Sequence, residues 1–421
     1  MNDKLKKALH AQLGKKYLNQ KELQYSTDAN VLLTPYEYKQ YLEYKEDLIE
    51  RNEEKDLLIG LPLKSFNSRC IYYCLGDELL SLLESYLTLL KEDYTYNSDT
   101  LSNRFASNIY KSRLYSEIEG SLNVENVPTT RRRLKELLEE NAKAENINDI
   151  IIQNMDKAIK FVEELPSFNK ENLLKLYNIL SENCLEEDNK LREGDYYRYD
   201  TVEIGGYHGC PYSQISECMD SLFKFVNDSL KQERSLTWML MPYICHYYIL
   251  YIHPYFDYNG RTARMVSYWI LLLADDECFP PIISEAINQT KSQYYRALEQ
   301  SRDSHNDMSY FFIYLFSISC DYILCYKNVE SIEQKLKNKG IILTDTDRNY
   351  IKKIMITYNG KFTYMDFLKN CNIEMSKQGA LKTLNKLVDY DFLEITETPS
   401  KSKLFDVNKG VIPYKLSSFN L

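Results

Sequence analysis

Two arginines stand three residues apart in the segment HPYFDYNGRTAR, which covers residues 253–264. The apolar run that follows Arg264 predicts a buried helix that begins near Gly260. A helix N-terminus carries partial positive charge, so cations there are unfavourable unless an anion is present. Backbone N–H groups at such a helix start bind anions, and planar guanidinium groups clamp phosphates. Arg261 and Arg264 therefore predict a polyphosphate site.

Two residues just upstream could do chemistry at this site. Asp257 precedes the turn, and a single carboxylate beside bound phosphates is a common way to hold Mg²⁺. His253 ends an apolar segment, and Pro254 forces it out of helical geometry. A histidine fixed near a metal–phosphate centre can act as a general base. Each residue alone is more often a cap, turn or salt-bridge residue, but the combination at this spacing favours a site for a magnesium–nucleotide complex.

Two large classes of nucleotide-binding protein are excluded. The chain lacks the GxxxxGK[ST] segment of P-loop NTPases, and it lacks the lysine and DFG set of protein kinases.

The segment resembles the signature of Fic-domain proteins, which reads His-Pro-Phe, any residue, Asp/Glu, Gly-Asn-Gly-Arg, two residues, Arg. Most members of this family transfer AMP from ATP to a hydroxyl side chain of a target protein. The resemblance implies that His253 deprotonates the target hydroxyl and that Asp257 holds Mg²⁺. The positions that it assigns to the nucleotide phosphates are Asn259, Gly260, Arg261 and, reaching the γ-phosphate, Arg264.

The segment departs from the family signature at two positions. Tyr255 replaces the usual Phe, which is a mild change at a core position. Tyr258 replaces the first Gly of Gly-Asn-Gly. If this position requires a positive φ, tyrosine is strained there, and its ring could also crowd the phosphates.

Two further segments resemble parts of the same family. Residues 198–208, RYDTVEIGGYH, alternate and contain Gly205-Gly206, so they predict a β-hairpin. The segment GDYYRYDTVEIGG, residues 194–206, resembles the family's hairpin. In the family this hairpin is a flap that aligns target side chains. Tyr294 and Tyr295 fall in a segment that resembles the family's closing helices, where they face the nucleotide base or pack in the core.

Residues 108–123 resemble the N-terminal inhibitory helix of one Fic class, with the pattern Ser/Thr, three residues, Glu-Gly. Glu119 and Gly120 fit this pattern, although Tyr115 stands at the Ser/Thr position. The resemblance implies that Glu119 pairs with Arg264 and blocks the γ-phosphate position. The alternative is a helix that ends at Gly120 as its C-cap.

The composition is that of a soluble, cytoplasmic protein. The 421 residues carry a net charge of −9, which argues against a nucleic-acid coat, and the 10 scattered cysteines are expected to be reduced, buried thiols. The N-terminus lacks the apolar core of a signal peptide. Residues 235–256 lack charges and are long enough to span a bilayer, but their histidines, prolines and tyrosines favour a buried helix. No membrane partner is expected.

Most of the chain has helical periodicity. The expected helices lie at 77–91, 130–141, 147–164, 170–183, 213–230, 236–252, 260–274 and 308–326. The last 81 residues, 341–421, contain 12 Lys+Arg and 9 Asp+Glu, a balance of +3. Their pattern predicts helices at 344–357, 363–370 and 376–389, followed by strands at 392–397 and 404–407. This order predicts a winged helix-turn-helix or, equally, a small interaction or dimerisation module.

The sequence thus predicts a mainly α protein: a Fic helical bundle with a β-hairpin flap and a small C-terminal winged helix. The expected domains are an N-terminal helical region (1–104), a Fic domain with its inhibitory helix near 108–120 (105–330) and the winged helix (341–421). The expected function is adenylylation of Ser, Thr or Tyr hydroxyls of an unidentified target protein, self-modification included, with ATP and Mg²⁺ and with inhibition by Glu119. The alternatives are a nucleotide-sensing regulator that binds DNA through its C-terminal module, and de-adenylylation or transfer of another phosphate-linked group.

Overall fold

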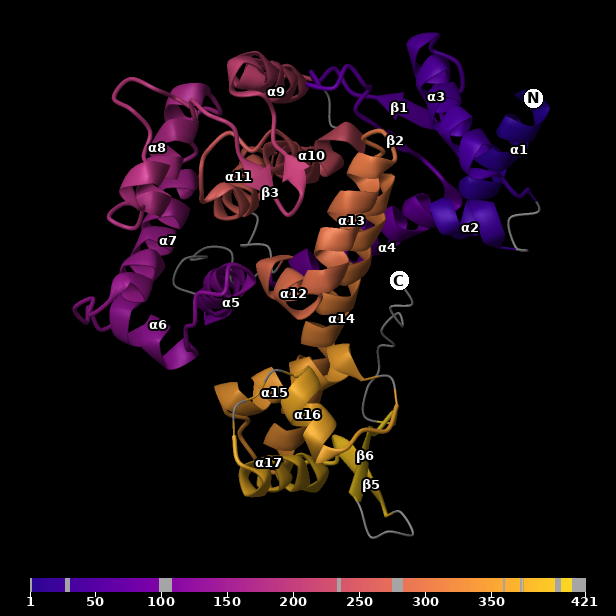
Figure 1. Ribbon diagram of the computed structural model, residues 1–421. Coiled ribbons are helices and arrows are strands. Elements are labelled where there is room, and N and C mark those ends of the chain that lie inside the picture. The colour runs from indigo at the N-terminus through magenta and orange to yellow at the C-terminus, as the bar shows by residue number, and fades with distance from the viewer. Residues whose placement is uncertain are drawn as a thin grey trace. The chain divides into compact units, whose positions relative to one another are not determined.

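The computed structural model describes residues 2–26, 31–97, 108–232, 236–274, 283–358, 360–371, 373, 375–397 and 403–410. The chain divides into two compact units, one built from Met1–Glu84 and Tyr94–Leu315 and the other from Ser85–Asp93 and Phe316–Leu421. The elements are mainly helices, with a few short strands, as predicted (Figure 1). The division at 104, 330 and 341 stays a prediction.

The first unit begins with three helices, a short sheet and the start of a fourth helix, whose residues Ser85–Asp93 belong to the second unit. The elements in this part are α1 (Asn2–Gln12), α2 (Gln20–Tyr25), α3 (Pro35–Glu50), β1 (Leu58–Gly60), β2 (Tyr72–Cys74) and α4 (Asp77–Asn97). Capping boxes at Asn19 and Thr34 fix the starts of α2 and α3. Strands β1 and β2 pair antiparallel, with Ile59 opposite Tyr73.

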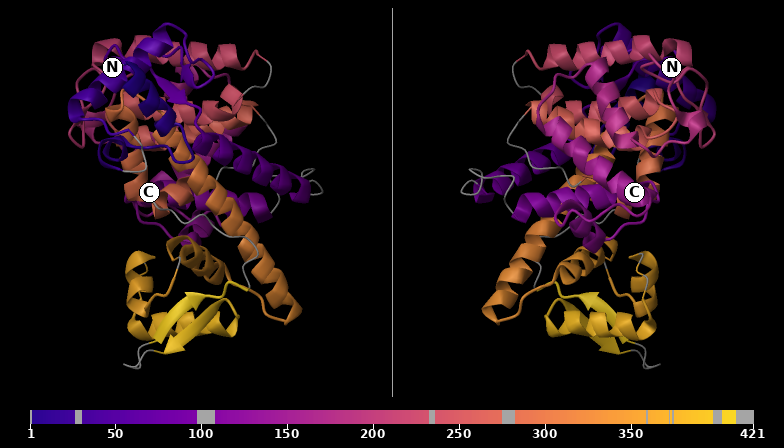
Figure 2. Two further views of the ribbon diagram at one scale, coloured as in Figure 1. Left: turned by 90° about the vertical axis from the view of Figure 1, so that its right-hand side faces the viewer. Right: turned by 90° about the vertical axis from the view of Figure 1, so that its left-hand side faces the viewer.

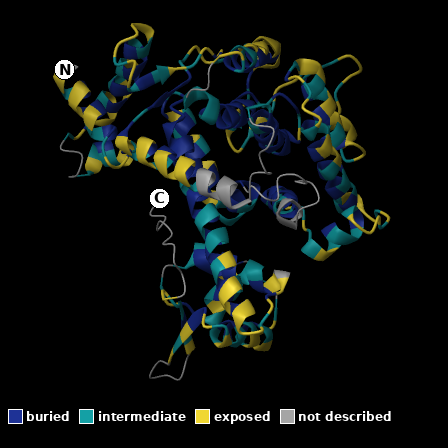
Figure 3. Cartoon of the chain, turned by 180° about the vertical axis from the view of Figure 1, so that it is seen from behind, coloured by how far each residue is buried: buried dark blue, intermediate teal, exposed yellow. Residues whose placement is uncertain are grey.

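The middle of the first unit is a helical bundle around α10 and α11. Its elements are α5 (Asn108–Val124), α6 (Arg131–Leu138), α7 (Ile147–Glu163), α8 (Lys170–Ser181), η3 (Glu187–Asn189), β3 (Glu203–Ile204), β4 (Tyr207–His208), η4 (Tyr212–Gln214), α9 (Ile215–Ser229), α10 (Leu236–Ile252), α11 (Asn259–Ala274), α12 (Ile283–Gln289), α13 (Lys291–Asp303) and the start of α14 (Ser309–Asn338). Most residues of α10 and α11 are buried (Figure 3). Residues Leu236–Ile252 of the uncharged segment therefore form a buried core helix, as predicted.

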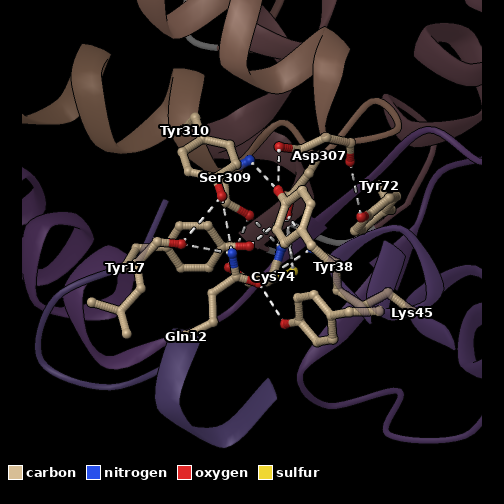
Figure 4. Close-up of polar contacts among 12 residues, drawn as sticks. Gln12, Tyr17, Tyr38, Lys45, Tyr72, Cys74, Asp307, Ser309 and Tyr310 are labelled. Carbon is tan, nitrogen blue, oxygen red and sulfur yellow. Dashed lines mark hydrogen bonds and ion pairs between the residues drawn. The ribbon is translucent and has the colours of Figure 1, made fainter. Parts of the chain in front are cut away.

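A buried ion pair joins the N-terminal helices to the segment between α13 and α14. Lys45 Nζ lies 2.7 Å from Asp307 Oδ2, and both side chains are fully buried. Tyr17 Oη donates to the same carboxylate oxygen at 2.5 Å, and the backbone N–H of Ser309 donates to Oδ1 at 3.1 Å (Figure 4). Gln12 Oε1 accepts from Lys45 Nζ at 3.3 Å. The buried charges are thus paired and hydrogen-bonded, which offsets their desolvation.

The backbone reinforces this junction. Tyr72 N donates to Asn306 O at 3.3 Å, and Met308 N donates to Tyr72 O at 2.8 Å. Strand β2 is thereby hydrogen-bonded to the segment between α13 and α14. The N-terminal helices are therefore part of the same compact unit as the bundle.

The second unit has its own hydrophobic core, built around Ile351, Phe367 and Leu384. Its elements are α15 (Asp345–Thr357), α16 (Tyr364–Asn370), α17 (Lys377–Asp389), β5 (Leu393–Glu397) and β6 (Lys403–Val407), together with the later part of α14. Strands β5 and β6 form an antiparallel hairpin, which Figure 2 shows in yellow beside the helices. The predicted order of three helices and two strands is confirmed.

One helix within the described residues is long and apolar enough to cross a membrane by length and composition. It is α14, and 78% of its most apolar 18-residue window is buried.

Removal of one partner of the Lys45–Asp307 pair is expected to destabilise the protein strongly. Asp307→Asn leaves the Lys45 ammonium buried without its counter-ion, which costs roughly 3–5 kcal/mol. Replacing both residues, as Lys45→Met with Asp307→Leu, should recover much of the loss. The measurement is urea-induced unfolding of the full chain, followed by circular dichroism. Lys224→Met is the matched control, because it breaks an exposed pair with Asp228 in α9 and should leave the midpoint close to that of the wild type.

Candidate functional site

The loop between α10 and α11 holds the predicted base. Helix α10 ends at Ile252, and His253 takes a positive φ of 54° while its N–H still donates to Ile249 O at 2.8 Å. Asn259 then closes the loop: its Oδ1 accepts from Tyr255 N at 3.0 Å, and its Nδ2 donates to Tyr255 O at 2.8 Å. The Asn259 side chain thus fixes the loop conformation. The family resemblance implies that the same residue lines the anion site.

Tyr255 anchors this loop in the core. Its side chain is fully buried and stacks on Tyr177 of α8, with ring centroids 3.8 Å apart and planes at 8°. The expectation that Tyr255 stands at a core position is therefore confirmed. The loop that carries His253 has a rigid base.

The environment of His253 keeps its imidazole neutral at physiological pH. The pKa of His253 is lowered from 6.5 to about 4, mainly by burial and also by the nearby charge of Arg198. A hydrogen bond to the Leu250 carbonyl and the charge of Glu125 act in the opposite direction but do not prevail. A neutral imidazole can accept a proton, as a general base must.

Arg198, which the sequence analysis did not single out, ties the flap to this loop. The flap is the hairpin β3–β4, with Glu203 paired to His208, so the predicted hairpin is confirmed. Arg198 is 2% exposed; its Nε donates to His253 O at 2.8 Å, and its Nη2 donates to Cys210 O just after the flap. One buried guanidinium therefore joins the backbone of the base to the end of the flap. The only sign of this role in the sequence is that Arg198 stands in the tyrosine-rich segment before the hairpin. That sign does not distinguish a buried arginine from an exposed one.

Asp257 has the chemistry that a magnesium ion needs. Half of its side chain is exposed, and Oδ1 accepts from Tyr258 N at 2.6 Å. The described residues contain no group of three His, Cys, Asp or Glu side chains that could hold a metal. Asp257 therefore fits a Mg²⁺ ion held by one carboxylate and by substrate phosphates, and does not fit an all-protein metal cage.

The first turn of α11 already contacts an anionic group, the carboxylate of Glu125. Arg264 Nη2 lies 2.8 Å from Glu125 Oε1, and the Arg264 side chain is 2% exposed. A Cβ atom added at Gly260 would lie 2.3 Å from the same oxygen, so the carboxylate rests on the backbone of this turn. Burial would raise the pKa of Glu125, but the charge of Arg264 and its hydrogen bond hold that pKa below its ordinary value. The carboxylate is therefore ionised at neutral pH.

Ser121 completes the contact between α5 and Arg264. Its Oγ accepts from Arg264 Nε at 3.0 Å, and its carbonyl oxygen accepts from Arg264 Nη2 at 3.1 Å. Ser121 stands four residues before Glu125, and this is the Ser/Thr-to-Glu spacing of the inhibitory pattern that Tyr115 breaks for Glu119. Ser121 and Glu125 have the same separation as Tyr115 and Glu119, six residues further along the chain. This repeat was the signal that could have identified Glu125.

The sequence predicts that Glu119 pairs with Arg264, but the structure places Glu125 there. Glu119 Oε2 instead lies 3.9 Å from Arg131 Nη1. The difference arises because α5 does not end at Gly120. It continues to Val124, so the C-cap alternative for Gly120 is wrong. A Cβ atom at Gly120 would lie 2.3 Å from Glu285 N, so this glycine allows α5 to pack closely on α12.

A second carboxyl group fixes α5 against α12. Glu117 is 5% exposed and accepts hydrogen bonds from the N–H of Ser284, at 3.0 Å, and from its hydroxyl. Burial raises the pKa of Glu117 to about 7, even though the Ser284 bonds and the charge of Arg264 lower it. Together with the close packing at Gly120, this contact sets the position of α5, the helix that precedes Glu125.

The other predicted aromatic residues differ in burial. Tyr294 is 2% exposed, and its hydroxyl lies 2.9 Å from His246 Nε2, so it is a core residue. Tyr295 is 48% exposed. Tyr258 has a positive φ of 66°, so the strain anticipated for a tyrosine at this position is present.

The family comparison covers the loop, the flap and the start of α11. Residues 167–271 match the family model described as Fic/DOC family. This segment of the chain is therefore similar to Fic-domain proteins. Curated relatives named "Protein adenylyltransferase Fic" include those of Drosophila mojavensis, 26% identical over 235 residues, and Drosophila grimshawi, 30% identical over 111 residues.

These matches are partial. The alignment to the Drosophila mojavensis protein covers 54% of this chain and 43% of that protein, and the alignment to the Drosophila grimshawi protein covers 26% and 22%. The chain therefore spans less than half the length of these relatives. A crystal structure of a Fic family protein from Desulfovibrio desulfuricans G20 covers 80% of this chain and 98% of its own, with a TM-score of 0.50 and 16% identity. That likeness supports the predicted helical Fic fold.

The ring of His253 is expected to stay neutral in the folded protein down to about pH 5. The unfolded chain binds a proton near the ordinary pKa of 6.5, whereas folded His253 does so at about 4. Its contribution to stability is therefore complete above pH 6.5 and is lost as the pH falls through 4. An NMR titration of ¹⁵N-labelled histidine rings measures this directly, with His253→Asn to assign the signal. A midpoint near 6.5 would show that the ring is solvated and would contradict the buried-base geometry.

Proposed function

We propose that this chain is a protein adenylyltransferase that transfers AMP from ATP to a hydroxyl side chain of a target protein. The observation that carries the proposal is the first turn of α11, where a carboxylate lies against the Gly260 backbone and Arg264. A site that binds one anion on backbone N–H groups and a buried guanidinium can bind a phosphate in its place. The family and the adenylyltransferase relatives support the same function.

The proposed reaction forms a bond between the target hydroxyl oxygen and the α-phosphorus of ATP, and pyrophosphate leaves. Neutral His253 accepts the hydroxyl proton. Arg261 and Arg264 hold phosphate oxygens, and Asn259 keeps the loop that carries the base in register with the start of α11. A Mg²⁺ ion held by Asp257 would neutralise charge on the phosphates. Most of the catalysis on this scheme is positioning and electrostatic stabilisation.

The flap and Arg198 position the target on this scheme. Arg198 bonds the backbone of His253 and the residue that follows Gly209, so the flap and the base move together. A Cβ atom at Gly209 would lie 3.4 Å from His253 Cβ. A target segment bound along the flap is therefore held close to the base. The target protein is unidentified, and tyrosines on the protein's own surface, such as Tyr212, are available for self-modification.

We further propose that the site is autoinhibited by a carboxylate from α5. The expectation from the sequence assigns this role to Glu119, and the contact between Glu125 and Arg264 supports Glu125 in its place. A carboxylate against Arg264 neutralises a cation meant for the γ-phosphate. It also repels an incoming polyanion at short range.

A second candidate function is DNA binding by the C-terminal unit. An isolated bridge between Phe362 and Phe405 adds a third extended segment to the β5–β6 hairpin. The order helix, bridge, two helices and hairpin is that of a winged helix-turn-helix, and Lys377 and Lys382 are exposed on α17. These features support a recognition helix. A small interaction module remains the alternative because the charge balance of +3 over residues 341–421 is low for DNA binding.

Removal of the proposed base should abolish transfer but not binding. His253→Ala is expected to lower label incorporation from [α-³²P]ATP into lysate proteins, or into the protein itself, by 10²–10⁴-fold. ATP binding, measured by calorimetry, should stay within a few-fold of the wild-type value. Incorporation from [γ-³²P]ATP should be absent, which distinguishes AMP transfer from phosphoryl transfer, and the mass of the adduct identifies any other group. Full activity of the variant would show that His253 is not the base.

Glu125→Gly should raise transfer at least tenfold, which corresponds to about 1.4 kcal/mol of barrier. Glu119→Gly is the matched control and is expected to have a much smaller effect, because Glu119 lies beside Arg131. Adding Arg264→Ala to Glu125→Gly should remove the gain, since the released cation is then missing. Initial rates of label incorporation measure all four proteins. The opposite ranking of the two glutamate variants would return the inhibitory role to Glu119.

A further inference from the structure

Tyr258 occupies a backbone position that suits glycine. Its φ is 66°, a region that a bulky side chain adopts only at a cost, and its side chain is nearly fully buried, at 3% exposed. Its carbonyl oxygen accepts from Thr262 N at 2.9 Å, so Tyr258 precedes the first turn of α11. A glycine would satisfy the backbone here without strain. The tyrosine side chain must therefore contribute an interaction that offsets this cost.

The side chain of Tyr258 lies between Arg261 and Cys184. Its ring lies under the guanidinium of Arg261, with Arg261 Cζ 3.3 Å from the ring centroid. Burial raises the pKa of the Tyr258 hydroxyl, and the neighbouring Cys184, in the segment after α8, raises it further. Cys184 in turn donates to Glu182 O at 3.2 Å and accepts from Asn154 Nδ2 at 3.7 Å. The ring is thus a rigid platform between two elements of the bundle.

Because Arg261 stacks on the Tyr258 ring by its face, its N–H donors stay available to a ligand. The Arg261 side chain is 7% exposed, and its Nε and Nη1 are buried without a hydrogen-bond partner. Its Nη2 lies 3.8 Å from Asp257 Oδ1. Buried donors normally have partners, so two orphaned donors on one guanidinium indicate a ligand that supplies acceptors. The N–H donors of a planar guanidinium match the oxygens of phosphate groups.

We propose that Tyr258 is a positioning residue that holds Arg261 by its face, so that its Nε–H and Nη1–H donors are aligned in advance for phosphate oxygens of the bound nucleotide. The inference rests on the proposed function, since it concerns the same site. It adds a residue at which this chain departs from the glycine of the family signature. The inference also explains why tyrosine stands in place of glycine. The backbone strain of Tyr258 is offset by a cation–π contact that fixes the Arg261 side chain before the ligand binds.

The competing interpretation is that the ring crowds the phosphates or merely fills the core. Three substitutions separate these possibilities. Tyr258→Phe keeps the aromatic face and loses the hydroxyl, Tyr258→Leu keeps apolar bulk and loses the face, and Tyr258→Gly relieves the backbone and removes the side chain. A role in packing alone treats Phe and Leu alike, whereas a role in stacking does not.

The experiment uses the full chain with Glu125→Gly, so that the site is open to ligand. Calorimetric Kd values for ATP and for inorganic tripolyphosphate, together with kcat and KM for ATP, are measured for each variant. We expect Tyr258→Leu and Tyr258→Gly to weaken both ligands by about tenfold, the size of a desolvated cation–π contact, with the loss in KM and not in kcat. Tyr258→Phe should retain most of the affinity. In an Arg261→Ala background the Tyr258 substitutions should have no further effect.

The outcomes distinguish this inference from the proposed function. Equal affinities for Phe, Leu and Gly, or tighter binding by Gly, overturn the positioning role while leaving adenylylation intact. If tripolyphosphate binds with the expected ranking but no AMP is transferred, the proposed function fails and the role of Tyr258 stands. Failure of both ligands to bind the Glu125→Gly protein overturns the inference, because Arg261 then has no phosphate to recognise. Thermal unfolding of each variant checks that the fold is retained.

Discussion

Positive charge at the start of α11 is the constraint on which the site depends. Backbone N–H groups of the first turn, Arg261 and Arg264 all concentrate there, and the arginines are almost fully buried. Buried cations at a helix N-terminus are unfavourable without a counter-ion. The protein meets this requirement for Arg264 with Glu125 and for Arg261 with the face of Tyr258. These two contacts differ. The Glu125 carboxylate occupies the anion site beside Arg264, whereas the Tyr258 ring leaves the Nε–H and Nη1–H donors of Arg261 free.

The proposed base is positioned by a different set of contacts, and none of them involves Glu125 or Arg264. Asn259 closes the loop, Tyr255 fixes it to Tyr177, and Arg198 binds the carbonyl of His253 from the side of the flap. The geometry around His253 therefore persists whether or not Glu125 stays on Arg264. An inhibitory contact that acts only on the phosphate position can block nucleotide binding without disturbing the catalytic loop.

Much of this arrangement could be predicted from sequence, because it is local. The helices α7 to α11, the flap and the elements of the second unit all have periodicities or turn residues within a short window, and they match the predicted ranges closely. Contacts between distant residues were not predictable. Lys45 and Asp307 are 262 residues apart, and no local pattern marks a lysine that is buried. Glu125 was missed because Glu119-Gly120 fits the family pattern, whereas the continuation of α5 to Val124 depends on packing against α12.

The position of Glu125 beyond the end of α5 determines how the site could open. Gly120 and Glu117 fix the helix on α12, so the helix itself is expensive to move. Glu125 follows the last helical residue, Val124, in a turn where its N–H bonds Leu122 O at 3.1 Å, and its side chain is 29% exposed. Rotation of this one side chain toward solvent releases Arg264 without unfolding α5. On the proposed autoinhibition, a rigid helix followed by an inhibitory carboxylate on a solvent-facing turn allows release through a local change, while Ser121 stays on Arg264 and holds the guanidinium for an incoming phosphate.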